Sequence, residues 1–406
     1  MIRRSLAPAA ARCYRGGVTG TPDRPSRRGG SALLWMALAA CGGGGTRGAA
    51  PTPTELRIAD APGDGGVFDP APMSDGAGGL WMSYSAVATS AHATPAAPLD
   101  QVRTRLASSS DAGATFADLG LDPSGLADAD LQVPDGQGGL LWATWRFEVS
   151  RLLFDPYDPD AARRWKIVWH RLVAAAGGEQ GVAHFETGWV GESTAPDPRG
   201  PWSAERKLLS GAGYSSAMDA FIGPPELPLS ALFPGPGALG GCAFFSEPGL
   251  LARPEGIYLS LLCAGTPSKT VLLRCDHAFS SCDYLGDLLQ DAEAASFSTA
   301  SDAYQGFSGS ELVETARAVY LIVTPWVNPP EAYRGCLAFR VSDLATATVE
   351  RSAGAPVLVA RISGVPGSFH GACGYHPDAT GSGIVYGQYQ DVAPHYHIFE
   401  SHLTLP

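Results

Sequence analysis

The strongest constraint on the fold is a pattern of three strand-like segments that recurs five times between residues 66 and 405. The segments are short, apolar and rich in Val, Ile, Tyr and Trp, as β-strands are. First segments lie at 68–73, 148–156, 245–251, 307–314 and 369–375, second ones at 78–87, 164–173, 256–265, 318–326 and 382–390, and third ones at 102–111, 188–197, 271–283, 336–345 and 396–405. One such unit cannot bury both faces, so the units must pack radially, which predicts an all-β, five-bladed β-propeller.

Two other arrangements remain open on the sequence alone. The segment 130–145 is an extra strand or hairpin, and the propeller has six blades if it forms a whole unit. A two-sheet β-sandwich is the other alternative. Helical bundles and coiled coils are excluded, because 50 Gly and 33 Pro among 406 residues interrupt helices too often. The most helix-like stretch is short, at 285–295.

The first 40 residues have the pattern of an export signal. They hold seven arginines and a single acid, Asp23, and end in an apolar run from Ser31 to Ala40 that is too short to span a bilayer. The tetrad Leu38-Ala39-Ala40-Cys41 resembles the cleavage site of bacterial lipoproteins, which implies lipidation at Cys41. We therefore expect a signal at 1–40, a flexible tether at 41–60, the propeller at 61–406, and a lipid-anchored protein of the bacterial cell envelope, on the periplasmic or surface side of the outer membrane. An ordinary secretory signal is the alternative.

Charge and cysteine content fit an exported protein. The formal net charge is −12, and no basic stripe is present for nucleic acid. Beyond residue 200 lie six cysteines, an even number that predicts disulfides in an exported chain, and Cys275 and Cys282 are spaced to close a small loop. Zinc is the weaker interpretation, because the chain has no CxxC or HxxxH spacing.

Two segments resemble known propeller families. Ser109 to Phe116 reads SSDAGATF, similar to the Asp box of sialidase-like propellers, which is a structural hairpin turn. The second unit carries Glu148, strand-like segments at 152–155 and 165–170, and Gly200-Pro201-Trp202. This succession resembles the five-bladed propellers of glycoside hydrolase family 43 and its relatives. The resemblance implies that acids at the starts of the inner strands face a central pit.

Residue by residue, the resemblance implies a catalytic set. Asp69, in an Asp-Pro of the first unit, matches the general base, and Glu247 stands where the family has an acid that tunes a pKa. The general acid expected in the fourth unit is replaced by Ser308, and Glu311 lies three residues later. We therefore predict Asp69, Glu247 and Glu311 as catalytic.

Further residues are predicted to bind substrate: Glu148, Asp219, Ser308 and His370. Asp219 is an alternative to Glu247 as the pKa-tuning acid, and His370 matches a central His near a bound cation or water in relatives. Each Asp-Pro or Glu-Pro acid also has the simpler interpretation of a solvated turn residue.

Two functions follow from this set. The first is a glycoside hydrolase that acts on a poly- or oligosaccharide with inversion, in which one charged and one protonated carboxyl flank the bond. The second is a propeller that binds glycan or protein without turnover, since fold does not decide function. We expect a monomer that binds carbohydrate and, through its lipid, the membrane. No cofactor is required, and a structural calcium near the centre is possible.

Overall fold

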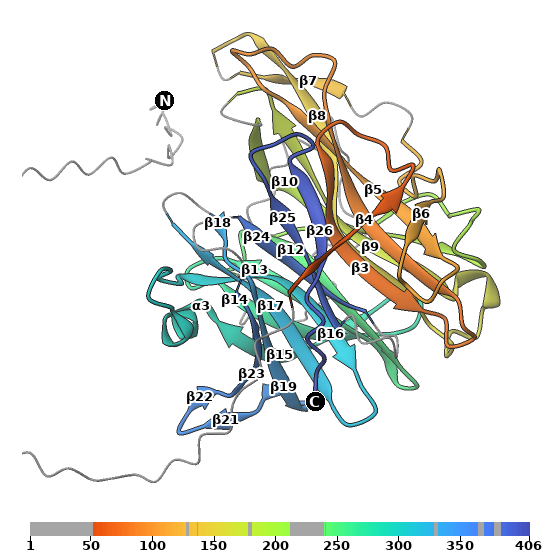
Figure 1. The fold of residues 1–406 in the computed structure, drawn as a ribbon, viewed down its shortest axis with the longest axis vertical. Coiled ribbons are helices and arrows are strands. Elements are labelled where there is room, and N and C mark those ends of the chain that lie inside the picture. Colours follow the sequence, from red (N-terminus) through yellow and green to blue (C-terminus); the bar gives the residue numbers. More distant parts are fainter. Residues whose placement is uncertain are drawn as a thin grey trace, which may run out of the picture. The chain divides into compact units, whose positions relative to one another are not determined.

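The computed structural model describes residues 52–126, 130–135, 137–177, 181–211, 239, 241–328, 332–363, 369–376 and 383–406. These residues are almost entirely β-structure (Figure 1). Within the described ranges, helical turns are confined to a 3₁₀ turn at Ala161–Arg163, α3 (Asp291–Ala294) and a second 3₁₀ turn at Ala295–Phe297. No helix of the described ranges is long and apolar enough to cross a membrane.

Four large sheets contain most of the strands. A nine-stranded sheet holds β1 (Thr54–Leu56), β2 (Ile58–Ala59), β3 (Gly66–Ser74), β4 (Leu80–Thr89), β5 (Asp100–Ser109), β6 (Phe116–Asp118), β24 (His370–His376), β25 (Gly383–Tyr389) and β26 (Tyr396–Glu400). A five-stranded sheet holds β7 (Asp130–Pro134), β8 (Leu140–Phe154), β9 (Trp165–Ala175), β10 (Val182–Ala195) and β11 (Arg206–Leu209).

The remaining sheets follow in chain order. A four-stranded sheet holds β12 (Phe244–Arg253), β13 (Gly256–Ala264), β14 (Lys269–Cys275) and β15 (Cys282–Gln290). A six-stranded sheet holds β16 (Gly306–Glu314), β17 (Val319–Val327), β18 (Ala332–Tyr333), β19 (Cys336–Asp343), β20 (Thr348–Val349) and β23 (Leu358–Ile362). The small hairpin of β21 (Arg351–Ser352) and β22 (Ala355–Pro356) stands apart.

Five inner strands close a ring. In the described part of the chain, β3 packs against β8, β8 against β12, β12 against β16, β16 against β24, and β24 back against β3. Each is the first strand of a predicted unit, and consecutive antiparallel strands follow it outward. In a two-sheet sandwich the last inner strand would not pack against the first one. The prediction of an all-β propeller is therefore confirmed, and the sandwich is excluded.

The first and last units share the nine-stranded sheet because the chain closes on itself. Strand β1 pairs antiparallel with β26 through Thr54↔Glu400 to Leu56↔Ile398, and the chain then crosses to β2, which pairs with β6 of the first unit. Leu56 is buried. Two strands thus lie within the segment 41–60 that the sequence predicts as a tether, because burial of Leu56 and pairing with β26 and β6 order its described part.

Every inner strand contains a β-bulge at the corresponding point. Pairing with the next strand shifts register between Phe68 and Ala71, Glu148 and Arg151, Ser246 and Gly249, Ser308 and Ser310, and Gly371 and Gly374. Each bulge holds one residue with positive φ: Asp69 (52°), Val149 (53°), Glu247 (58°), Gly309 (56°) and Ala372 (52°). The bulge therefore defines equivalent positions in all five inner strands. A bulge re-aims the side chains around it, which suits the centre of a propeller.

The residues two positions after each positive-φ residue form a second ring, which fills the central axis of the propeller. Its members are Ala71, Arg151, Gly249, Glu311 and Gly374. The small members are tightly enclosed, since a Cβ at Gly374 would lie 2.2 Å from the Pro70 carbonyl oxygen. Arg151 and Glu311 occupy the remaining space as an ion pair, with Arg151 Nε 2.5 Å from Glu311 Oε2.

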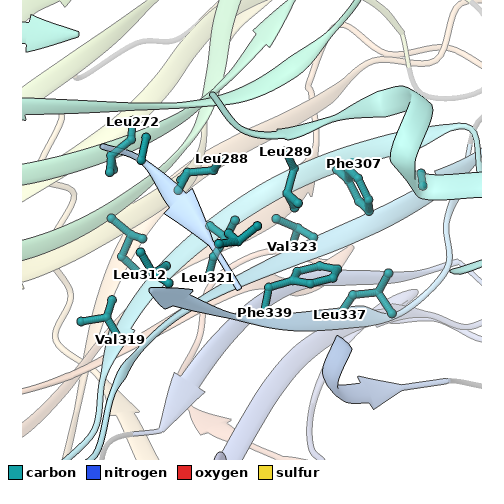
Figure 2. Packing of buried hydrophobic residues seen from close by; sticks show 14 of the residues in the cluster. Leu272, Leu288, Leu289, Phe307, Leu312, Val319, Leu321, Val323, Leu337 and Phe339 are labelled. Carbon is teal, nitrogen blue, oxygen red and sulfur yellow. The ribbon is translucent and has the colours of Figure 1, made fainter. Parts of the chain in front are cut away.

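Apolar side chains fill the spaces between neighbouring sheets. Figure 2 shows one such layer, in which Leu272 and Leu289 of the third unit meet Phe307, Leu321 and Phe339 of the fourth. Burial of side chains of this size supplies the main stabilisation of the ring.

The six late cysteines pair as Cys242–Cys263, Cys275–Cys282 and Cys336–Cys373, as the even count predicted. The second bridge closes the small loop expected from its spacing. The third joins β19 of the fourth unit to β24 of the last.

Three local predictions can be compared with the fold. The segment 130–145 forms a hairpin of β7 and β8 within the second sheet, so it is not a separate blade. The helix-like stretch at 285–295 is strand as far as Gln290, because its apolar residues pair with β14, and only then turns into α3. The SSDAGATF segment is the turn between β5 and β6, where the Asp111 carboxylate accepts hydrogen bonds from the Thr115 amide and hydroxyl.

Candidate active site

A cavity of about 460 Å³ lies against the inner strands. Four carboxyl residues line it: Asp69 of β3, Asp100 of β5, Glu148 of β8 and Glu247 of β12. Five aromatic side chains also line it: Phe68, Phe185, Tyr333, Phe369 and Tyr396. A concave, mostly apolar space with a few convergent polar groups is the usual form of a ligand site.

Asp69 is held in one orientation. The side chain is buried, and its Oδ2 atom accepts hydrogen bonds from Ser85 Oγ at 2.6 Å and from the Val149 amide at 3.1 Å. Burial raises the pKa of the Asp69 carboxyl, while both hydrogen bonds and the charge of Arg151 act in the opposite direction. Two hydrogen bonds and one guanidinium therefore favour the charged form of Asp69 against the effect of burial.

The Glu247 carboxyl accepts fewer hydrogen bonds than that of Asp69. Burial raises its pKa to about 8, with a further increase from the charges of Asp69 and Glu148. Tyr333 donates its hydroxyl to Oε1 at 3.1 Å, and Oε2 is buried with no hydrogen-bond partner among the described residues. At neutral pH this carboxyl is protonated, so it has a proton to donate.

Space for the Glu247 side chain comes from the neighbouring strand. A Cβ built at Gly309 would lie 3.3 Å from Glu247 Oε2. Gly309 has a φ of 56°, which glycine adopts at little cost. The bulge of β16 thus carries no side chain where β3 and β12 carry a carboxyl, and the third-unit acid lies against that gap.

Glu148 directly precedes the bulge residue Val149 and also lines the cavity. Burial raises its pKa to about 7; the charge of Arg146 lowers it, and that of Asp69 raises it further. Arg146 lines the same wall and donates its Nε hydrogen to the Asp100 carbonyl oxygen at 3.2 Å. The cavity is therefore lined by four carboxyl residues and one guanidinium.

Glu311 and Arg151 do not line this cavity. Besides its ion pair with Glu311, Arg151 donates to the carbonyl oxygens of Ser310 and Cys373 at 3.2 and 3.1 Å, and so joins three inner strands. Burial raises the pKa of Glu311 to about 7, and Arg151 acts against that rise. The structure thus assigns Glu311 a partner in the axis of the ring, whereas its catalytic role stays a prediction.

The predicted binding residues fall in different places. Glu148 lies in the cavity, and Ser308 lies beside it, with its Oγ 3.3 Å from the Tyr333 hydroxyl. His370 is buried at the start of β24, where its ring meets Tyr386 edge-on, and does not line the cavity. Asp219 lies outside the described residues.

Sequence reasoning missed the aromatic wall. Phe68 packs against Phe369 and Tyr396, with ring centroids 5.5 and 5.3 Å apart, and Phe369 stacks on Tyr333 at 5.0 Å. Phe68 stands next to Asp69 in the sequence, but Tyr333, Phe369 and Tyr396 come from segments with no motif. Their only common signal is position near the starts of strands in the last two units.

Within the described ranges, no group of three or more His, Cys, Asp or Glu side chains is arranged to hold a metal ion.

Comparison with known proteins gives structural neighbours alone. No family model matches the chain, and no curated protein matches it. Solved structures with similar folds include a family 117 glycoside hydrolase of the marine bacterium Zobellia galactanivorans (14% identity, 86% of this chain and 89% of that one, TM-score 0.47). Another is the catalytic domain of a family 62 α-L-arabinofuranosidase of Coprinopsis cinerea (11% identity, 86% of this chain and 94% of that one, TM-score 0.44). A third is an endo-arabinase of Bacteroides thetaiotaomicron (10% identity, 86% of this chain and 96% of that one, TM-score 0.44).

Proposed function

We propose that the protein is a glycoside hydrolase that cleaves a poly- or oligosaccharide in the cavity by single displacement with inversion. One observation carries the proposal: two carboxyls at equivalent bulges line one cavity, Asp69 with two hydrogen bonds that favour its charged form and Glu247 with a pKa raised to about 8. Inverting glycosidases need this pairing of a charged and a protonated carboxyl.

The chemistry follows from the two environments. Asp69, oriented by Ser85 and the Val149 amide, accepts a proton from a water molecule that attacks the anomeric carbon. Glu247, whose raised pKa keeps it protonated at neutral pH, donates its proton to the leaving glycosidic oxygen. The C–O bond breaks as the new C–O bond forms, and the two carboxyls exchange protonation states, which solvent then restores.

The other cavity residues bind the sugar. The aromatic wall of Phe68, Tyr333 and Phe369 offers flat faces for the apolar side of a sugar ring. Glu148 and Arg146 supply hydrogen-bond acceptors and donors for hydroxyl groups.

A non-catalytic glycan-binding propeller is the second candidate. The observation that favours it is the bulge of β16, where Ser308 and Gly309 offer no carboxyl although the resembling hydrolases have their acid in that unit. In that case the cavity binds sugar through the same aromatic wall without turnover.

We further propose that the protein acts at the cell envelope, with a lipid on Cys41 after removal of residues 1–40. The arginine-rich segment, the apolar run and Leu38-Ala39-Ala40-Cys41 support this location. The lipid would then be the membrane anchor, so that a variant without Cys41 is released from membranes.

Incubation with plant, fungal and bacterial polysaccharides, among them arabinan, tests the proposal. The mature domain is expected to release reducing ends from at least one, and Asp69→Asn is expected to release none. Asn adopts positive φ readily, so this variant keeps the bulge. Binding of a polysaccharide by wild type without any release of reducing ends would establish the second candidate instead.

A further inference from the structure

The second unit extends well beyond the cavity. Strand β8 runs 15 residues from Leu140 to Phe154, and the cavity is lined from it only by Arg146, Glu148 and Val149. The first part of β8 pairs with β7 in a hairpin (Figure 1). Most of the large apolar side chains exposed in the described ranges belong to this extension: Leu140, Leu141, Trp142, Val182 and Phe185.

One exposed aromatic side chain lies on the cavity's side of this strand. Pairing of β8 with β9 is regular from Ala143 to Glu148, and that of β7 with β8 is regular up to Thr144. Alternate residues of a strand share a face, so Trp142 lies on the same face as Arg146 and Glu148. Six residues of strand separate Trp142 from Glu148, about 20 Å. Phe185, exposed on β10, lines the cavity mouth.

Trp142 is held rigidly. Its ring stacks on His92 of the loop after β4, with centroids 3.4 Å apart and planes at 5°. Asp130 of β7 fastens this loop and strand β5 to the hairpin: it lies 3.6 Å from His92 Nε2 and accepts a hydrogen bond from Gln101 Nε2 at 2.7 Å. With one face covered by His92, Trp142 is still 39% exposed. A flat aromatic surface is thus preorganised beside polar groups.

We propose that this surface, defined by Trp142, His92 and Phe185, is a second binding site for the same glycan chain whose other part enters the cavity. The proposal rests on the proposed function and narrows its substrate to a polymer several sugar units long. Its continuity with the cavity along one face of β8 favours a chain-like ligand. A strip this narrow is small for a protein partner, since stable interfaces bury about 800 Å² on each side.

Affinity electrophoresis tests the proposal through binding alone. All proteins carry Asp69→Asn, so that no gel polysaccharide is cleaved, and native gels contain soluble arabinan, arabinoxylan, β-glucan or alginate. Trp142→Ala is the test variant. Tyr157→Ala is the matched control, because Tyr157 is an equally exposed aromatic residue (45%) just beyond the other end of β8.

The expected result is retardation of the parent in at least one gel, at least a five-fold weaker retardation of Trp142→Ala, and no change for Tyr157→Ala. Equal retardation of all three, or free migration of the parent in every gel, overturns the proposal. So does a parent that is dimeric by light scattering and becomes monomeric with Trp142→Ala, because a second copy then covers the surface. Trp142-dependent retardation without reducing ends from wild type would reject the hydrolase and leave the binding surface standing.

Discussion

Asp69 and Glu247 occupy the same position of the repeat. Each is the positive-φ residue in the bulge of its inner strand, each is followed by proline, and each carboxyl lines the same cavity. Their surroundings differ: Asp69 accepts two hydrogen bonds on one oxygen, whereas Glu247 has an oxygen without a partner among the described residues. A non-glycine residue in this backbone region costs about 1–2 kcal/mol. The proposed function gives these two acids, which face one cavity, complementary roles as base and acid.

Glu247→Gln is expected to lower kcat by at least 100-fold on the substrate that the polysaccharide screen identifies, because the amide cannot donate an acidic proton. Wild-type activity should fall as pH rises through about 8, where Glu247 loses its proton. Measurement of kcat against pH checks both. Unchanged kcat in Glu247→Gln would remove this residue from the mechanism.

Glu247 also makes stability depend on pH. Its pKa in the folded protein is about 8, above the ordinary value of 4.5, so its contribution is fully present below about pH 4.5 and is lost as pH rises through 8. The free energy of unfolding, measured with denaturant at pH 5 and pH 8, is expected to differ less between the two pH values for Glu247→Gln than for wild type. Equal differences in the two proteins would show that Glu247 does not titrate as its burial implies.

The axial ion pair makes a third prediction. Glu311→Gln leaves the buried Arg151 guanidinium without its counter-ion and is expected to lower the free energy of unfolding by about 3–5 kcal/mol. The double variant Arg151→Met, Glu311→Leu removes both charges and should recover much of that loss. If Glu311→Gln is as stable as wild type in urea unfolding, the pair does not hold the ring together.

Sequence periodicity predicted the strands well, since the three segments of each unit correspond to β3–β5, β8–β10, β12–β14, β16, β17 and β19, and β24–β26. It could not predict register at the axis. A bulge adds one residue to its strand, so a shift of one or two positions moves a side chain from the cavity to another level of the ring. Glu148 stands one position before its bulge residue and Glu311 two after, and only the former lines the cavity.

The site's remaining walls come from residues that carry no pattern. Tyr333 belongs to the two-residue strand β18, and Phe369 directly precedes β24. They meet only because the fourth and fifth units adjoin, which is a long-range contact that local sequence does not encode. Strand β1 falls within the predicted tether for the same reason, since its partner β26 lies more than 340 residues later.

The disulfide with the longest loop should matter most. Cys336 and Cys373 are 37 residues apart, against 7 for Cys275 and Cys282. Loop entropy predicts a loss of about 4 kcal/mol for the Cys336→Ser, Cys373→Ser variant and about 2 kcal/mol for the pair of the short loop. Thermal unfolding of the two variants compares them. A larger loss from the short loop would show that native contacts outweigh the entropy of the unfolded chain.

Closure of the ring depends on its first strand. β1 is the outermost strand that pairs with β26, and its Leu56 packs against Ile398 and Met82 in the shared core of the first and last units. Leu56→Ala is expected to lower the free energy of unfolding by about 2–5 kcal/mol, as in other buried leucines. Thr52→Ala is the control, because Thr52 is exposed and precedes the strand.

Hydrogen exchange should also be faster in β26 of Leu56→Ala than in the central strand β13, since β26 loses its outer partner while β13 keeps both neighbours. If exchange rises equally in β13 and β26, the ring unfolds as one cooperative unit and β1 is not a separate closing element.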